Sequence, residues 1–158
     1  MRANKYIRTG LRDRNGIEIK AGNIVQTKRV GIEYQTHTGD NIPNGSYTEP
    51  CGVIVYINQY VIEFKLGCFC LVPLDDHNFD SFNALGYLYN PDGTIQEYTE
   101  KEIIQSLDMK RNRDPWDNDY SEEKESFEYL LKDMGMTANE LIHDCKIQII
   151  AKSLNQLP

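Results

Sequence analysis

A histidine surrounded by acidic residues is the first group in this 158-residue chain that could bind a metal ion or transfer a proton. The histidine is His77, and the segment LDDHNFD places Asp75, Asp76 and Asp80 beside it. A metal site needs further ligands at a defined spacing, but the chain has no H-E-x-x-H motif and no double C-x-x-C motif. We therefore interpret His77 as an ordinary histidine in a solvated loop.

The four cysteines predict neither a zinc site nor a disulfide. Their C-x-C and H-x-C spacings differ from those of zinc knuckles. Cys68 and Cys70 lie two residues apart on one face of a predicted strand, a poor position for a disulfide between them. We expect reduced, mostly buried thiols and neither a metal nor a cofactor. Convergence on zinc is the alternative, and it would involve Cys51, Cys68, Cys70, His143 and Cys145.

Motifs for catalysis, nucleotide binding and calcium binding are also absent. The chain has no G-x-S-x-G, no G-x-x-x-x-G-K-[ST] and no G-x-G-x-x-G. A partial calcium-loop pattern in DNDYSEEKESFE fails because Glu122 occupies the position where the sharp turn requires glycine. The sequence therefore predicts no catalytic residue, and we expect a protein that is not an enzyme.

Charge is unevenly distributed along the chain, whose formal net charge is −7. Residues 114–144 carry ten acidic and two basic residues. Such a segment is either a solvated face or a surface that binds a basic protein, where Trp116 and Tyr120 would be suitable anchors. We favour binding to a host or phage protein. The candidate partner-binding residues are Asp114, Trp116, Asp117, Asp119, Tyr120, Glu122 and Glu123.

The basic N-terminal segment supplies an alternative function. Residues 1–29 carry eight basic and two acidic residues, so this segment could contact nucleic acid. The candidate contacts are Arg8, Arg12, Arg14, Lys28 and Arg29. A sequence pI near 4.9 argues against this class, because nucleic-acid-binding domains are usually basic. A protein that sequesters a small molecule is a third possibility.

Turn signals and short strand-forming segments predict a mainly β fold. Asn15-Gly16 favours a type I′ hairpin turn, and Gly93 suits the positive-φ position of a second hairpin. The strand GNIVQTKRV precedes a loop expected at residues 36–50. The segment GVIVYINQYVIEF predicts two strands separated by a turn at Asn58-Gln59, and GCFCLVPL predicts another. Short strands at this spacing are typical of a small barrel or sandwich.

Helical patterns follow between residues 99 and 144. Thr99 and Thr137 each precede a glutamate by three residues, as in a capping box, and Gly135 suits a helix C-cap. The segment KIQIIAKSL then predicts a C-terminal strand. We therefore expect an α+β, mainly β fold: a small SH3-like β-barrel with a helical acidic insertion. The expected parts are a barrel-like domain at 1–98, the insertion at 99–144, and the closing strand and tail at 145–158.

The segment TGLRDRNGIEIKAGNIV resembles the hallmark segment of the YopX family of phage and prophage proteins, T-G-L-x-D-x-N-G-x-E-I-x-x-G-D-I-V. The visible departure is Asn23, where the family usually has an acid. The tail IQIIAKSLNQLP is similar to the closing strand of that family, with Ala151 in place of a glycine. The matching residues are Thr9, Gly10, Leu11, Asp13, Asn15, Gly16, Glu18, Ile19, Gly22, Ile24 and Val25.

The resemblance implies a mainly β protein from a phage or prophage and no enzymatic activity, because the molecular role of the family is itself uncharacterised. Apart from this resemblance, the glycines of the hairpin meet backbone requirements and its apolar residues can alternate into a core. No apolar run approaches the roughly 20 residues that span a bilayer. The N-terminus has no apolar signal segment, so we expect a cytoplasmic protein of a bacterial host cell, not associated with a membrane.

Overall fold

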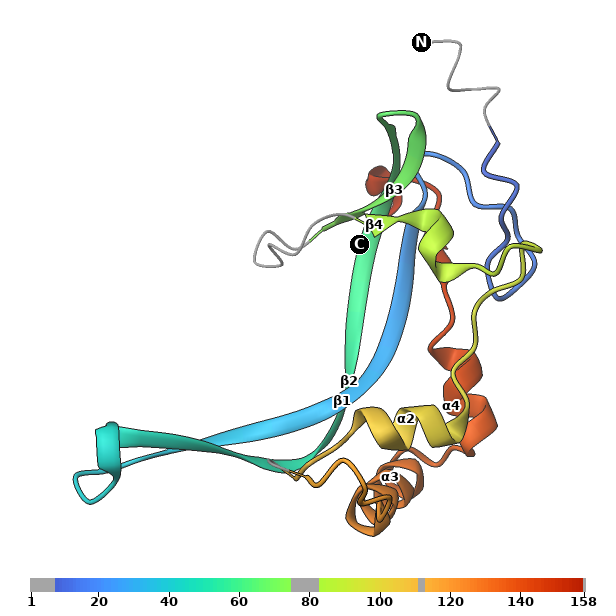
Figure 1. Cartoon of the computed structure of the whole chain (residues 1–158). Helices are drawn as coiled ribbons and strands as arrows, with labels where there is room; N and C mark the ends of the chain where they lie inside the picture. The colour runs from blue at the N-terminus through green and yellow to red at the C-terminus, as the bar shows by residue number, and fades with distance from the viewer. Residues whose placement is uncertain (1–7, 75–82, 111–112, 158) are drawn as a thin grey trace. The chain divides into compact units, whose positions relative to one another are not determined.

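The computed structural model describes residues 8–74, 83–110 and 113–157 (Figure 1). His77 and the three aspartates beside it lie outside these residues. The contacts of the chain divide it into two compact units. Unit 1 comprises Met1–Lys28, Ile57–Glu97 and His143–Pro158, and unit 2 comprises Arg29–Tyr56 and Tyr98–Ile142. The domain boundaries expected from the sequence stay a prediction.

Within the described residues the chain forms one five-stranded sheet with the order β4-β3-β2-β1-β5. The strands are β1 (Ile24–Thr38), β2 (Ser46–Lys65), β3 (Cys68–Pro73), β4 (Asn83–Ala84) and β5 (Gln148–Ala151). The pairs β2–β3, β3–β4 and β1–β5 are antiparallel. The mainly β, α+β class is confirmed, as is the C-terminal strand, which pairs with the start of β1. The sheet is open in these residues, with β4 and β5 at its edges.

Strands β1 and β2 extend further than the sequence analysis predicts. The loop expected at residues 36–50 is confined to residues 39–45, which include the short 3-10 helix η1 (Pro43–Gly45). Side-chain pairs across the two strands hold the flanking residues in the ladder. The Oγ1 atoms of Thr36 and Thr48 lie 2.9 Å apart, and the rings of His37 and Tyr47 stack with centroids 4.8 Å apart.

The turn expected at Asn58-Gln59 is also wrong, because β2 runs through both residues. The side-chain amide of Gln59 donates a hydrogen bond of 3.0 Å to the side-chain oxygen of Gln26 on β1. Polar residues at this point therefore support the pairing of two strands instead of interrupting one.

The type I′ turn lies elsewhere than predicted. Gly16 has a φ of 78°, but Asn15 is not among the described residues with positive φ. A 2.9 Å bond from the Gly16 N–H to the Asp13 carbonyl closes this turn. Its two central residues, Arg14 and Asn15, do not have positive φ, so the turn is not of type I′. Among the described residues, positive φ at two successive positions occurs at Leu66 (52°) and Gly67 (80°), which join β2 to β3, and at Asn44 (62°) and Gly45 (80°), between β1 and β2.

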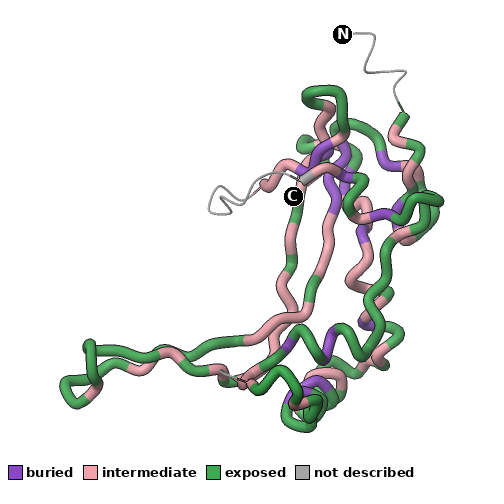
Figure 2. Tube along the Cα trace, viewed as in Figure 1, coloured by how far each residue is buried: buried purple, intermediate pink, exposed green. Residues whose placement is uncertain are grey.

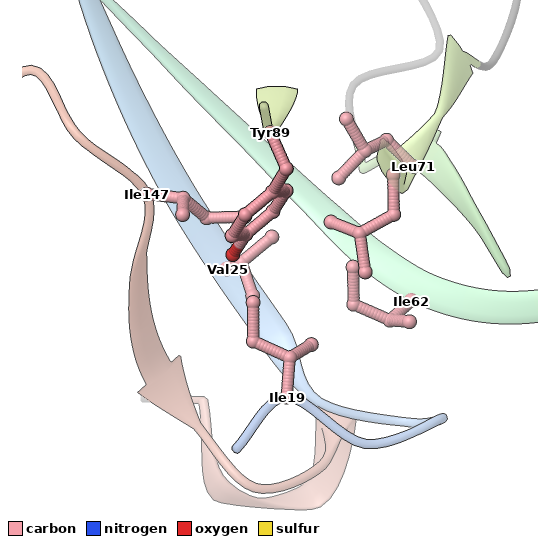
Figure 3. Close-up of a cluster of buried hydrophobic side chains, with 7 residues drawn as sticks. Ile19, Val25, Ile62, Leu71, Tyr89 and Ile147 are labelled. Atoms are coloured by element: carbon pink, nitrogen blue, oxygen red, sulfur yellow. The ribbon is translucent and has the colours of Figure 1, made fainter. Parts of the chain in front are cut away.

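The core of unit 1 gathers residues from distant parts of the sequence (Figures 2 and 3). The N-terminal hairpin, β1, β2, β3 and the 3-10 helix η2 (Leu85–Leu88) each contribute, as does the segment just before β5. The clustered buried residues are Ile19, Val25, Ile62, Leu71, Leu85, Tyr89 and Ile147. The hydroxyl of Tyr89 donates to the Arg12 carbonyl at 2.8 Å, which binds the hairpin to this core. A further 3-10 helix, η3 (Leu154–Gln156), follows β5.

The helices predicted between residues 99 and 144 are present, and all of their residues except His143 and Asp144 belong to unit 2. They are α2 (Glu100–Ser106), α3 (Ser121–Met134) and α4 (Ala138–Asp144). The caps are confirmed: the Thr99 hydroxyl accepts from the Glu102 N–H, and Gly135 ends α3 with a φ of 66°. Their buried apolar residues are Ile103, Ile104, Leu107, Phe127 and Leu141. No helix among the described residues has the length and apolar character needed to cross a membrane.

Candidate functional site

Trp116, the single tryptophan of the chain, is 88% exposed. It lies in residues 113–120, which precede α3 and which we name the Trp116 loop. A tight turn is closed by a 2.9 Å bond from the Asp117 N–H to the Asp114 carbonyl, with Pro115 at its second position. The Asp114 carboxylate accepts from the Trp116 N–H at 3.0 Å. The indole is therefore exposed on a backbone that its own neighbours fix.

Arg113 anchors this loop to the rest of unit 2. Its guanidinium donates to the Asp108 carboxylate at 2.9 Å, to the Glu123 carboxylate at 2.5 Å and to the Asp119 carbonyl. The same group lies over the Tyr120 ring, 4.4 Å from its centroid. The Arg113 side chain is only 7% exposed. A single buried cation thus connects α2's C-terminal end, the loop and the first turn of α3.

Glu123 requires a correction, because the sequence analysis placed it on the partner-binding surface. Its side chain is fully buried, and one oxygen accepts from Arg113 and from the Met109 N–H. Its other oxygen has no hydrogen-bond partner. Burial of a carboxylate requires a compensating cation, which Arg113 supplies. Glu123 therefore positions the loop and does not face a partner.

The remaining acidic candidates stay on the surface. Asp114, Asp119 and Glu122 are exposed, and Asp117 is half-buried. The Asp119 carboxylate accepts from the N–H and the hydroxyl of Ser121 at the start of α3, and these bonds lower its pKa. The bond from Arg113 likewise lowers the pKa of Asp108. Asp108 and Asp119 therefore keep their negative charge to lower pH than free carboxylates do.

Tyr120 does not stand free beside Trp116 as the sequence analysis expects. Its ring is half-buried under Arg113 and serves as part of the anchor. Arg113 itself was missed, because its role depends on three partners at different sequence distances. The available signal was one basic residue within a segment of acids, next to a tyrosine. Trp116 is thus the aromatic side chain that the loop offers to solvent.

Of the basic candidates for nucleic-acid contact, Arg8, Arg12 and Arg29 are exposed, and Arg14 and Lys28 are half-buried. Arg8 pairs with Glu18 at 3.2 Å, and Arg29 lies over the Tyr56 ring, 4.9 Å from its centroid. Arg12 is exposed and donates to the Gly16 carbonyl at 2.7 Å. Arg12 therefore keeps most of its guanidinium available to solvent.

Arg14 and Lys28 meet at Asp144, a residue that the sequence analysis did not single out. Arg14 donates to the Asp144 carboxylate at 3.0 Å and to its carbonyl at 2.8 Å, and Lys28 lies 2.7 Å from the other carboxylate oxygen. The second guanidinium nitrogen of Arg14 donates to Gln148 at 2.7 Å. The bonds from Lys28 and Arg14 lower the pKa of Asp144. These cations hold unit 1 together and are not spare contacts for phosphate.

No group of three or more His, Cys, Asp or Glu side chains that could hold a metal ion occurs among the described residues. The four thiols are free, but the expectation that most of them are buried is wrong, because Cys51 and Cys68 are exposed. The Sγ atoms of Cys68 and Cys70 lie 3.6 Å apart. Cys145 is half-buried, and this burial raises its pKa to about 11. The described geometry therefore contains a two-thiol cluster but no larger set of ligands.

No protein-family model, curated protein or solved structure matches this chain. The assignment of a function consequently rests on the geometry of the described residues. Among these, the Trp116 loop combines a fixed backbone, an exposed aromatic ring and surface carboxylates.

Proposed function

We propose that this protein is a binding protein that takes a protein partner with a basic surface through the Trp116 loop. Trp116 is the anchor, and Asp114, Asp117 and Asp119 supply the charge around it. The observation that carries the proposal is the 88% exposure of the single tryptophan on an ordered turn. Tryptophan is enriched among the residues that contribute most to binding at protein interfaces.

The rigidity of the loop supports this function energetically. A partner that binds a flexible loop must offset the entropy lost when the loop is ordered. Here the bonds of Arg113 and the turn at Asp114 fix the backbone before any partner arrives. The anchor can therefore enter an apolar pocket without a large ordering cost.

The charge of the surface favours a basic protein over an acidic one. Glu122, Glu125 and Glu128 on α3 are exposed and extend the acidic surface beyond the loop. Attraction between opposite charges accelerates association, and salt screens this attraction. The affinity of the complex should consequently fall as ionic strength rises.

The setting of the protein is part of the same proposal. The resemblance of Thr9 to Val25 to the YopX hallmark supports a non-enzymatic accessory role in a phage or prophage, within the cytoplasm of the bacterial host. The departure at Asn23 has a physical reason in this chain. Its side chain accepts from the Lys20 N–H and donates to the Lys152 carbonyl, and an acid could make only the first bond.

We extend the proposal to an SH3-like barrel in unit 1. Its support is the enclosed cluster in which the hairpin, three strands and the segment before β5 share one core. A closed or nearly closed small barrel has this kind of interior.

The test is capture of a partner from nuclease-treated bacterial lysate on the immobilised chain, followed by mass spectrometry. The variant Trp116→Ala should reduce capture of the partner at least about tenfold. Asp114→Asn with Asp117→Asn should also weaken it, because asparagine keeps the turn-forming oxygen and loses only the charge. Tyr129→Ala is the matched control, since Tyr129 is 73% exposed on α3 but lies outside the loop.

Two results would contradict the proposal. If every captured protein binds Trp116→Ala as well as it binds the unaltered chain, the loop is not the interface. If capture disappears with nuclease and with Arg12→Glu, the protein binds nucleic acid instead, through its N-terminal hairpin.

A further inference from the structure

Cys68 and Cys70 form a pair of thiols on one face of the β2–β3 hairpin. Strand β3 pairs Cys68 with Lys65 and Cys70 with Glu63 across the ladder, so all four side chains lie on one face of the sheet. This face is opposite to the one on which Ile62 and Leu71 enter the core. Cys68 is exposed, whereas Cys70 is 1% exposed.

The separation of the two sulfur atoms fits a shared ligand and not a disulfide. Their distance of 3.6 Å is far longer than an S–S bond of about 2.0 Å. Residues two apart in a strand have Cα atoms about 6.7 Å apart, near the upper limit for a disulfide. In contrast, two thiolates on a tetrahedral zinc ion, with Zn–S bonds of about 2.3 Å, lie about 3.8 Å apart. The separation of the two sulfur atoms in this structure therefore matches the sulfur–sulfur separation of such a site.

We propose that Cys68 and Cys70 bind one thiophilic divalent metal ion of the Zn²⁺ and Cd²⁺ type. Both Sγ atoms bind the ion as thiolates, and each thiol releases one proton as its S–metal bond forms. Since no third ligand accompanies them among the described residues, the remaining coordination positions are open to water or to an external donor. This site is independent of the Trp116 loop and of its partner.

Lys65 shares this face of the sheet with the two thiols and is paired with Glu63 at 2.8 Å. Burial raises the pKa of Cys70, so the incoming ion must displace its proton. The other two thiols lack this arrangement. Among the described residues, neither Cys51 nor Cys145 has a contact with a second thiol, so neither can bind an ion through two sulfur atoms.

The experiment is a titration of the full, reduced, metal-free chain with Cd²⁺, following the thiolate-to-metal charge-transfer band in the ultraviolet. We expect saturation at one ion per chain and displacement of Cd²⁺ by Zn²⁺. Cys68→Ser should lower the affinity at least about tenfold and remove most of the band. Cys70→Ser should do the same, while its circular dichroism reports whether the buried position still folds.

Cys51→Ser and Cys145→Ser are the matched controls, and each should bind Cd²⁺ as the unaltered chain does. A band that survives in Cys68→Ser, or that depends on either control cysteine, would overturn the proposal. So would saturation at half an ion per chain, because the ion would then belong to a site shared by two copies. Since Cys68 is exposed, its replacement leaves the fold intact and gives a result on its own.

Discussion

The N–H of Ile149 donates a 2.9 Å hydrogen bond to the carboxylate of Asp13, a residue 136 positions earlier in the chain. The other oxygen of Asp13 accepts from the N–H groups of Asn15 and Ile17 within the hairpin. Asp13 is 3% exposed. One buried carboxylate thus shapes the first hairpin and connects it to the last strand.

Asp13→Ala should destabilise the protein by about 3 kcal/mol, because it leaves buried N–H groups without an acceptor. Urea unfolding followed by circular dichroism measures this loss. Asp92→Ala is the control, since Asp92 makes similar bonds to Thr94 in an exposed turn and its loss should have a much smaller effect. Equal effects of the two changes would show that Asp13 is not a central contact.

Asp144→Ala should destabilise unit 1 by about 1 to 2 kcal/mol, because both Arg14 and Lys28 lose a charged acceptor. A double-mutant cycle with Lys28→Met measures the coupling directly. The two changes should not be additive. Strict additivity would mean that the ion pair between Asp144 and Lys28 contributes nothing to stability.

The carboxylate of Asp144 also predicts that the stability of the protein depends on pH. Its pKa is lowered in the folded state, so the unfolded chain binds a proton more readily, and the contribution to stability is present above the unfolded value of about 3.9. The contribution is lost as the pH falls through the lower, folded value. The stability difference between the unaltered chain and Asp144→Asn should therefore shrink below about pH 4. A difference that instead grows in acid would contradict the assignment.

Arg113→Ala should destabilise the helices of unit 2, because the buried carboxylate of Glu123 loses its cation. Arg113→Lys should recover only part of the loss, since an ammonium cannot bond to three acceptors in the same plane. The helical signal in urea measures stability, and the emission of Trp116 reports on the loop. The double variant Arg113→Met with Glu123→Leu should be more stable than Arg113→Ala. If it is not, an uncompensated charge is not the cause.

Leu66→Asn should stabilise the protein by about 1 kcal/mol. Leu66 is 97% exposed and has a φ of 52°, a conformation that asparagine adopts more readily than leucine. Asn44→Leu is the reverse control, because Asn44 has a φ of 62° and should resist a branched apolar side chain. Thermal unfolding of both variants should give shifts of opposite sign. A loss of stability in Leu66→Asn would show that this leucine makes a contact that its exposure conceals.

Local signals in the sequence predicted the parts of the fold that local bonds determine. The cap at Thr99, the end of α3 at Gly135 and the strand at Gln148–Ala151 are confirmed. Each depends on residues within a few positions of one another, so their spacing carries the information. Trp116 lies in a polar segment between two helices, and its exposure agrees with that position.

Interactions between distant segments account for the errors. Residues 36–50 have the composition of a loop, yet pairing of Thr36 with Thr48 keeps both strands extended. The sequence predicts a surface position for Glu123, because no local pattern indicates that its carboxylate is buried against Arg113, ten residues earlier. The two-thiol cluster depends on side-chain rotation, which a C-x-C spacing alone leaves open.

The connection between the first hairpin and the last strand has a consequence for synthesis. Ile147 completes the core of unit 1, and Ile149 supplies the bond to Asp13, so unit 1 stays unfinished until both have left the ribosome. All residues of unit 2 precede His143. During translation, all residues of unit 2 have therefore been synthesised before the residues of β5 that bond to the N-terminal hairpin.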